Sequence, residues 1–447
     1  MRRDKITFLK NWRNDPIRVP LLIRGARQVG KSWLVTLFGQ EFSSYIELNF
    51  EKDKRVHALF PSHISLEKTL EQLQVYTQKK IIPGKTLLFL DEIQECPDAI
   101  RYLRYFKEEM PELHVIAAGS LLEFTLEKLG VAVGRVDYLF LYPLSFMEFL
   151  TANQRDDLRE NIERENIDPA THAVILDYLR NYMWLGGMPA VVDTWLTHKD
   201  SSLCQRIQDR IIKTYIDDFQ KYAKAHQVEH VGHAFSSIPK QLGKKFKYIS
   251  VDPEAKTYPI KQALHLLNKA GITYQCFHTA AQSYPLGSEV DEKKFKVFFF
   301  DIGIAHRILG LDLAEWVTHP LEVELFRFSA EQLVAQELIS YSEPSQKGEL
   351  YYWHNESATS NAEVDFITIH NKTIIPVEVK SKIKGGMKSL NVFLRKHPKS
   401  PYGIKISEGM FGKHDHLQEI PLYAVKNIRT SHDQTLAPRT KTVYRDK

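Results

Sequence analysis

The chain has 447 residues, of which 43% are hydrophobic, 26% charged and 11% aromatic. This composition excludes a disordered, fibrous or low-complexity protein, and the length corresponds to about two to four domains. Three widely spaced cysteines, without a Cys-Cys or Cys-His pattern, favour neither a disulfide scaffold nor a structural zinc site. Because no long apolar run is present and the N-terminus is highly charged, we expect a cytoplasmic protein that does not span a membrane.

The positive charge gathers at the C-terminal end. The net charge is +5, but residues 381–447 contain 14 Lys and Arg against 5 Asp and Glu. A basic segment beside a balanced body is typical of a polyanionic partner such as DNA. A solvated tail gives the same count, so both interpretations stay open.

A nucleotide-binding loop is predicted near the N-terminus. Residues 18–24, RVPLLIR, have the pattern of a short buried strand, and a helical stretch, WLVTLFG, begins at residue 33. The segment between them is a complete GxxxxGK[ST] motif in the strand–loop–helix context that a P-loop requires. Its residues are Gly25, Ala26, Arg27, Gln28, Val29, Gly30, Lys31 and Ser32.

This motif predicts ATP and Mg²⁺ as ligands. Gly25 and Gly30 allow a tight loop, whose backbone N–H groups hold phosphate together with the N-terminus of the following helix. We expect Lys31 to reach the β- and γ-phosphates and Ser32 to offer its hydroxyl to Mg²⁺.

Two further buried strands end in polar residues. The continuous apolar run 86–90 is followed by Asp91 and Glu92, which we expect to bind Mg²⁺ and to polarise the attacking water, respectively. The strand 114–120 ends in Ser120, which either contacts the γ-phosphate or the water, or caps the next helix. Strands alternating with helices predict an α/β fold with a doubly wound parallel sheet, whose ligand lies at the carboxyl ends of the strands. Gly25, Asp91 and Ser120 all fall at that edge.

From Leu141 onward the pattern becomes helical, interrupted by a turn at Gly186 and Gly187. A helical lid on the P-loop core is the natural interpretation, although packing alone also explains these helices.

Further on, helical patterns precede a strand at 272–277, an order that fits a winged helix. The segment IPKQLGKKFKYI carries Lys240, Lys244, Lys245 and Lys247, which either contact nucleic acid or form a solvated basic face.

Carboxylates and a lysine are predicted to meet on a hairpin in the last third of the chain. If Asn371 and Lys372 form a two-residue turn, Asp365 lies opposite Glu378, and Lys380 shares a strand face with Glu378. Two adjacent carboxylates repel unless a cation lies between them, so this layout suits Mg²⁺ or Mn²⁺ with Lys380 orienting a water. Polar positions on an exposed sheet face would give the same spacing.

Over nearly its full length the chain resembles a bacterial and archaeal family of predicted ATPases, in which an AAA-type P-loop domain (AAA_14-like) precedes a domain of uncharacterised function known as DUF4143. GARQVGKS, LLFLDEIQ and AAGS resemble the ATPase motifs, whereas AEQLVAQEL, AEVDFI and PVEVKS resemble a terminal PD-(D/E)XK nuclease fold. The resemblance implies that Glu331, Asp365 and Glu378 are metal ligands and that Asp365, Glu378 and Lys380 are catalytic. It also implies an arginine from a neighbouring subunit of a homo-oligomer, for which Arg135 is a candidate that surface packing would explain equally well.

These features predict four domains, namely a P-loop AAA-type core (1–140), a helical lid (141–227), a winged-helix-like domain (228–315) and a PD-(D/E)XK nuclease-like α/β domain (316–447). The favoured function is ATP binding and hydrolysis by a protein that acts on DNA. The alternative is a nucleotide-dependent switch or scaffold whose nuclease-like domain only binds. A metabolic kinase fits less well, because no small-substrate pocket signature accompanies the long C-terminal region.

Overall fold

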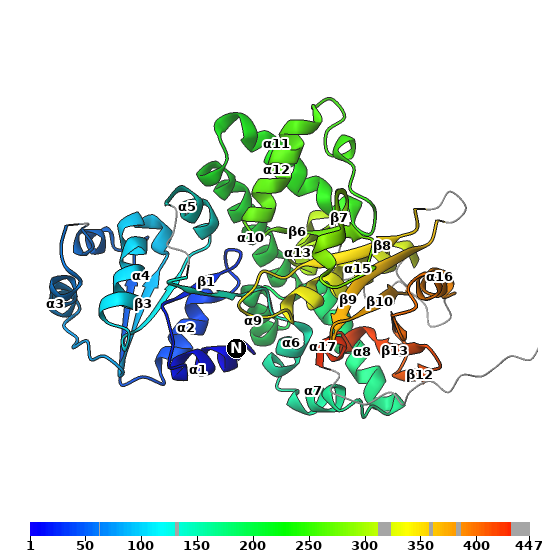
Figure 1. The fold of residues 1–447 in the computed structure, drawn as a ribbon, viewed down its shortest axis with the longest axis horizontal. Coiled ribbons are helices and arrows are strands. Elements are labelled where there is room, and N and C mark those ends of the chain that lie inside the picture. Colours follow the sequence, from blue (N-terminus) through cyan, green and yellow to red (C-terminus); the bar gives the residue numbers. More distant parts are fainter. Residues whose placement is uncertain (62, 130–133, 312–322, 357–360, 381–385, 431–447) are drawn as a thin grey trace, which may run out of the picture.

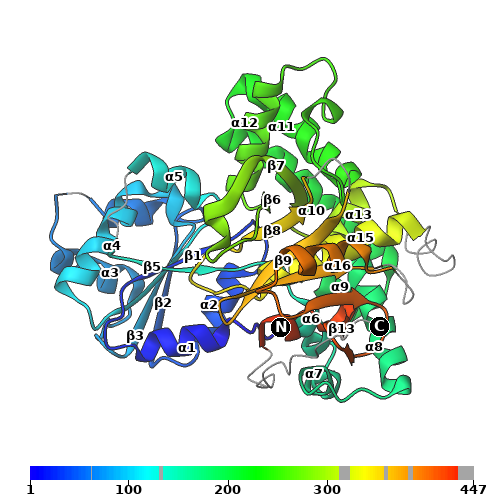
Figure 2. The same cartoon turned by 45° about the vertical axis from the view of Figure 1, so that its right-hand side comes forward.

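The computed structural model describes residues 1–61, 63–129, 134–311, 323–356, 361–380 and 386–430. Two β-sheets lie side by side with helices between and around them (Figure 1). A 45° turn shows both sheets and the pair of helices that projects above them (Figure 2). The expected α/β class is therefore confirmed.

Sheet A forms the core of the N-terminal part, and every pairing in it is parallel. Its strands, in spatial order, are β2 (Ser44–Asn49), β3 (Thr86–Asp91), β4 (His114–Ala118), β1 (Leu21–Arg24) and β5 (Asp137–Phe140). The predicted strand at residues 18–24 begins only at Leu21, directly after Pro20, which has no N–H to donate to a ladder. The predicted parallel sheet is confirmed.

Helices cover both faces of sheet A because successive strand residues point to opposite sides. Ile23 and Phe89 face one side and pack with Phe38, whereas Leu22 and Leu90 face the other side. The helices of this part are α1 (Ile6–Asn14), α2 (Lys31–Gly39), α3 (Leu66–Thr77), α4 (Pro97–Glu109) and α5 (Leu122–Leu129). The buried faces of α1 and α2 belong to the first cluster, and those of α3, α4 and α5 to the second.

A largely helical segment connects the two sheets. It comprises α6 (Phe146–Ala152), α7 (Asp156–Glu163), α8 (Pro169–Leu185), α9 (Pro189–His198), α10 (Ser201–Tyr222), α11 (Ala225–Ser237) and α12 (Thr257–Lys269). The predicted break between α8 and α9 is confirmed, with Gly186 at φ 77°. A Cβ atom there would lie 2.1 Å from Asp301 Oδ1, so only glycine fits this close approach.

Sheet B is mixed and contains strands from two of the predicted domains. Its order is β12 (Gly412–His414), β13 (Leu417–Pro421), β11 (Gly403–Ser407), β10 (Thr373–Val379), β9 (Glu363–His370), β8 (Leu350–His354), β6 (Thr273–Thr279) and β7 (Val290–Phe299). Parallel pairing of β6 with β8 carries the sheet across the predicted boundary at residue 315. Around it lie α13 (Ile302–Ile308), α15 (Val323–Ser340), α16 (Lys388–Lys396) and α17 (Asn427–Thr430).

The predicted register of the β9–β10 hairpin is confirmed. Thr373 pairs with His370, and Val377 pairs with Phe366. Asn371 and Lys372 form the two-residue turn at φ 48° and 62°, the left-handed values that favour Asn at such positions. The register puts Asp365 and Glu378 at opposite positions of the two strands.

One hydrophobic cluster runs through the molecule from sheet A to sheet B. It includes Ile23 of β1, Tyr182 of α8 and Val377 of β10, all fully buried. The helices of the predicted lid therefore pack into the same core as both sheets. Among the described helices, none has the length and apolar character needed to cross a bilayer.

Asp301 ties α13 to the turn between α8 and α9, and we expect its removal to weaken the fold. The fully buried carboxylate accepts bonds from Ile304 N (2.9 Å) and Gly187 N (2.7 Å). Asp301→Ala would lose a helix cap and leave a buried N–H unpaired, which lowers the free energy of unfolding by about 2–4 kcal/mol. Urea unfolding followed by circular dichroism measures this, with the exposed cap Asp168→Ala as the control of smaller effect. Equal losses in the two variants would contradict the prediction.

Candidate functional site

The loop of residues 25–32 joins β1 to α2 in a tight conformation. Gly25, Gln28 and Gly30 have φ values of 145°, 65° and 95°. A Cβ atom on Gly25 would lie 2.1 Å from the carbonyl oxygen of Leu141, so this glycine permits a close approach of two backbone segments. The local geometry is that expected of a phosphate-binding loop.

Ser32 and Asp91 meet at the edge of sheet A, as the sequence predicts. The Ser32 hydroxyl lies 3.1 and 3.0 Å from the two carboxylate oxygens of Asp91. Asn49, at the end of β2, donates to the same carboxylate over 2.8 Å. Burial and the neighbouring Glu92 raise the pKa of Asp91 to about 6, although the bonds from Ser32 and Asn49 oppose this shift. A hydroxyl and a carboxylate at this spacing are oxygen ligands of the kind that Mg²⁺ prefers.

The Lys31 ammonium folds back onto its own loop. It donates to the carbonyl oxygens of Gly25 (3.0 Å) and Ala26 (2.9 Å). Burial lowers the pKa of Lys31 to about 8, and the carboxylates of Glu92 and Asp91 partly oppose that shift. The side chain is thus held beside the loop by backbone carbonyls that a phosphate group could replace.

Glu92 has an unusual backbone conformation for its residue type, with φ 50°. Its carboxylate accepts a bond from Gln94 Nε2 over 2.7 Å. Gln94 also lies against Gly119 at the end of β4, where a Cβ atom would be 2.0 Å from Gln94 Oε1. Ser120 lies with Gly25 around a small cavity of about 30 Å³. The structure thus gathers the ends of β1, β3 and β4 as predicted.

Side chains from outside sheet A form hydrogen bonds to the phosphate-binding loop, and the sequence did not predict them. Arg27 makes a two-oxygen ion pair with Asp218 of α10 at 2.9 and 2.8 Å. Tyr215, one turn earlier, donates its hydroxyl to the Arg27 carbonyl over 2.6 Å. The buried Arg3 donates to the Val29 carbonyl at 2.7 Å and to Glu148 at 3.0 Å. No motif marks these partners, because they come from distant segments of the chain.

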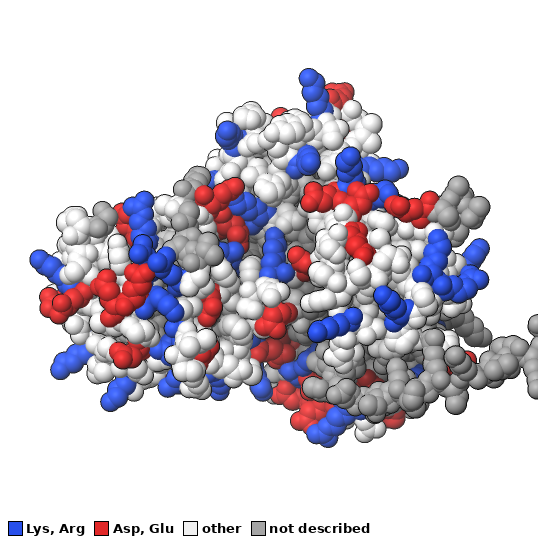
Figure 3. Space-filling view, in the orientation of Figure 1, with Lys and Arg blue, Asp and Glu red and all other residues white. Residues whose placement is uncertain are grey.

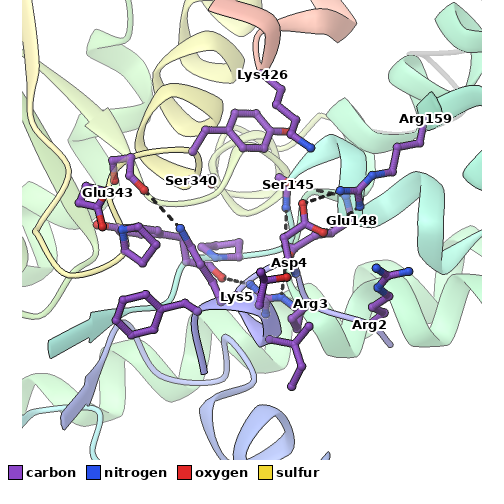
Figure 4. Close-up of a pocket in the computed structure, with 18 of the residues that line it drawn as sticks. Arg2, Arg3, Asp4, Lys5, Ser145, Glu148, Arg159, Ser340, Glu343 and Lys426 are labelled. Atoms are coloured by element: carbon purple, nitrogen blue, oxygen red, sulfur yellow. Dashed lines mark hydrogen bonds and ion pairs between the residues drawn. The ribbon is translucent and has the colours of Figure 1, made fainter. Parts of the chain in front are cut away.

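Arg3 also borders a cavity of about 520 Å³ between the N-terminal segment, α6 and the end of α15 (Figure 4). Four of its basic residues, Arg3, Lys5, Arg159 and Lys426, are paired with acids or carbonyls. Arg159 binds Asp4 at 2.8 Å, and Lys5 donates to the Ser342 carbonyl at 3.3 Å. None of the predicted site residues lines this cavity.

The four lysines that the sequence assigns to nucleic-acid contacts are all exposed. Lys240, Lys244, Lys245 and Lys247 lie between α11 and α12. Acidic and basic side chains intermingle over the face that Figure 3 shows.

Arg135, the candidate arginine finger, pairs with Glu108 at 2.8 Å. Two parts of the predicted basic C-terminal segment, residues 381–385 and 431–447, lie outside the described residues.

A second polar centre lies on sheet B where the hairpin places Asp365 and Glu378. Both carboxylates are buried, and Asp365 accepts a bond from Val379 N over 2.8 Å. Lys380 Nζ lies 2.6 Å from Glu378 Oε1. Burial, and then the Asp365 carboxylate, raise the pKa of Glu378, whereas Lys380 lowers it. The predicted convergence of these three side chains is present in the structure, but their catalytic roles stay predictions.

A buried lysine that sequence reasoning missed also enters this centre. Lys296 of β7 lies near Glu331 of α15 and near Glu363 and Asp365 of β9. Burial lowers the pKa of Lys296, but these three carboxylates hold it well above its usual value. A lysine inside the apolar run 295–300 could have pointed to it, as could the two-residue spacing of Glu363 and Asp365. Across the described part of the chain, no three His, Cys, Asp or Glu side chains form a group able to hold a metal ion.

Comparison with family models assigns both ends of the chain. Residues 18–150 match the AAA domain family AAA_14, and residues 327–425 match the domain of unknown function DUF4143. The chain is an AAA-domain protein with a C-terminal DUF4143 domain. A third model, the domain of unknown function DUF8612, matches residues 176–315 of this AAA-domain protein. The expected family is thus confirmed, and no curated protein matches the sequence.

Solved structures similar to this AAA-domain protein are distant. The Walker-type ATPase PABY2304 of Pyrococcus abyssi has 13% identity and a TM-score of 0.45, over 69% of this chain and 95% of that one. The Orc1 protein of Aeropyrum pernix in complex with DNA has 12% identity and a TM-score of 0.30, over 69% and 93%. Drosophila ORC bound to DNA has 13% identity and a TM-score of 0.25, over 68% and 85%.

Asp218 should control the mobility of the phosphate-binding loop. Asp218→Asn would remove the nearer of two charges that pair with Arg27, at 2.8 Å against 3.5 Å for Glu51, so we expect faster amide hydrogen exchange at residues 26–30 without nucleotide. Asp209→Asn is the matched control, because Asp209 lies on the same helix but pairs with Arg307 at 2.7 Å. Mass spectrometry of the labelled peptides measures the exchange. Unchanged exchange in Asp218→Asn, or an equal increase in Asp209→Asn, would refute this role.

Proposed function

We propose that this AAA-domain protein binds Mg·ATP at residues Gly25–Ser32 and Asp91 and hydrolyses it. The observation that carries the proposal is the contact of the Ser32 hydroxyl with both Asp91 oxygens beside a glycine-bounded loop. These two side chains follow different strands and meet only at the carboxyl edge of sheet A. They fit the ligand set of a magnesium ion that also contacts phosphate.

Each residue then has a defined task. Lys31 exchanges its bonds to the carbonyls of Gly25 and Ala26 for bonds to phosphate oxygens. Mg²⁺, when held by Ser32 and Asp91, neutralises charge on the phosphates. Glu92 orients the attacking water, and its bond to Gln94 fixes the direction of the carboxylate. Ser120 contacts the γ-phosphate or that water from the end of β4.

Nucleic acid is the proposed partner of the ATPase. The exposed lysines between α11 and α12 lie in a region where two helices precede the antiparallel strands β6 and β7. Helices followed by a β-hairpin fit a winged-helix-like arrangement, and exposed lysines suit phosphate contacts. In this proposal hydrolysis repositions the C-terminal domains on DNA. An arginine of a neighbouring subunit, with Arg135 as one candidate, would complete the site in a homo-oligomer.

The alternative function, a nucleotide-dependent switch whose nuclease-like domain only binds, has one observation in its favour. Lys296 lies among the carboxylates Glu331, Glu363 and Asp365, where a catalytic metal would be needed. ATP hydrolysis does not depend on this centre, so the two parts of the proposal can be tested separately.

Replacing Lys31 should abolish ATP turnover. Lys31→Ala removes the cation that reaches the phosphates, and we expect turnover to fall roughly 100-fold or more. Phosphate release in Mg²⁺ buffer measures this, and Lys10→Ala, an exposed lysine of α1 that pairs with Glu41 at 3.0 Å, is the control. Wild-type protein that neither binds nor hydrolyses ATP, or equal turnover in Lys31→Ala, would reject the ATPase.

DNA should raise ATP turnover at low salt, and the stimulation should fall steeply as salt increases, because phosphate contacts release counterions. A Lys240→Gln/Lys247→Gln variant should show a shallower salt dependence, by a slope of about 1 for each phosphate that the variant no longer neutralises. Lys413→Gln, an exposed lysine of β12, serves as the control. Turnover that DNA does not change at any salt concentration would favour the switch without nucleic acid.

A further inference from the structure

The acid centre of sheet B contains its own cation. Lys296 Nζ lies 2.8 Å from Glu363 Oε1, 3.5 Å from Glu331 Oε2 and 3.7 Å from Asp365 Oδ1. Only 1% of the Lys296 side chain is exposed, against 0% for Glu331 and 3% for Asp365. The ammonium group therefore has little contact with water, and carboxylates surround it.

The position of Lys296 is fixed by its strand. Cys276 of β6 pairs with Lys296 in the ladder, and Lys245 forms a bridge to it on the other side. Its ammonium group also lies 5.5 Å from the centre of the Tyr352 ring, within cation–π range. Lys296 thus enters the centre from a strand that precedes the DUF4143 match at residues 327–425. The centre is completed by a segment that lies outside that domain.

Lys296 supplies the positive charge that Glu331 and Asp365 would otherwise need from a metal ion, and Lys380 pairs with Glu378, the third acid that the sequence assigns to the metal. Buried carboxylates so close together require a cation, because they repel each other in a medium of low dielectric constant. Mg²⁺ and Mn²⁺ would use the same oxygens, and a divalent ion there would lie against a buried ammonium group of like charge. The donor set around Glu331 and Asp365 therefore does not fit a divalent metal while Lys296 is in place.

We propose that Lys296 is the resident cation of this centre and that wild-type protein binds no divalent metal there. The DUF4143 domain then has acidic residues arranged as in a nuclease, but a lysine occupies the position at which they would bind a metal ion. This conclusion differs from the metal site that the motif implies, and it does not depend on the proposed ATPase. It also predicts that removing the lysine leaves Glu331, Glu363 and Asp365 without their cation, so that these carboxylates can close around a metal ion.

Manganese binding tests the proposal directly. Mn²⁺ is titrated without nucleotide into the full chain, and bound and free ion are distinguished by electron paramagnetic resonance. Wild type and Asp365→Asn should bind the same number of ions, since any ion at the P-loop is common to both. Lys296→Met should bind one more Mn²⁺ per chain, and Lys296→Met/Asp365→Asn should lose it again.

A matched control comes from another buried lysine of the same sheet. Lys405 of β11 pairs with Glu419 at 2.9 Å, and Lys405→Met should gain no Mn²⁺ because the partly exposed Glu419 stays hydrated when the lysine is removed. A Mn²⁺ ion that wild type binds and Asp365→Asn loses would overturn the proposal, as would a folded Lys296→Met that gains none. Circular dichroism verifies folding. If Lys296→Met does not fold, the comparison of wild type with Asp365→Asn still decides.

DNA cleavage provides a second readout on the unmodified protein. With Mg²⁺ or Mn²⁺, wild type should cut plasmid DNA no faster than Asp365→Ala and Glu378→Ala do. Metal-dependent cleavage by wild type that both variants abolish would show that a metal does enter the centre, and would overturn the proposal whatever the ATPase result.

Discussion

Buried charge must be matched, and both polar centres of this protein are arranged by that constraint. At the P-loop, Lys31 is matched by two backbone carbonyls and Asp91 by the hydroxyl of Ser32 and the amide of Asn49. These partners are neutral, so a phosphate and a cation can replace them at little electrostatic cost. In the acid centre of sheet B, Lys296 is matched by carboxylates instead. In the proposed function the first centre exchanges these partners for a ligand, whereas in the second centre a lysine takes the place of a metal ion.

The P-loop is also the point at which distant parts of the chain meet. Arg3 binds the Val29 carbonyl from the N-terminal side, and Asp218 binds Arg27 from α10. The same helix contacts α13 through Asp209 and Arg307, and Asp301 ties α13 to the turn after α8. A change in the loop on ATP binding would therefore act on helices that pack into the core of both sheets. This gives the proposed coupling between nucleotide and C-terminal domains a physical route.

Sheet B explains why the hairpin alone does not define the acid centre. The register of β9 and β10 could be predicted, because a two-residue turn at Asn371 and Lys372 leaves one pairing that keeps the apolar residues buried. That register brings together Asp365 and Glu378. Lys296 was not foreseen, because the predicted domain boundary separated it from the hairpin. Only the parallel pairing of β6 with β8 places β7 in the same sheet.

The sequence by itself determined what depends on neighbouring residues. The loop at Gly25–Ser32, the buried strand ending at Asp91 and the hairpin turn follow from backbone freedom, apolar periodicity and turn chemistry within short segments. The tertiary structure alone decided which charges meet across long separations, namely Arg27 with Asp218 and Lys296 with Glu331. The reason is that burial sets the cost of a charge, and burial is a property of the assembled core rather than of any segment.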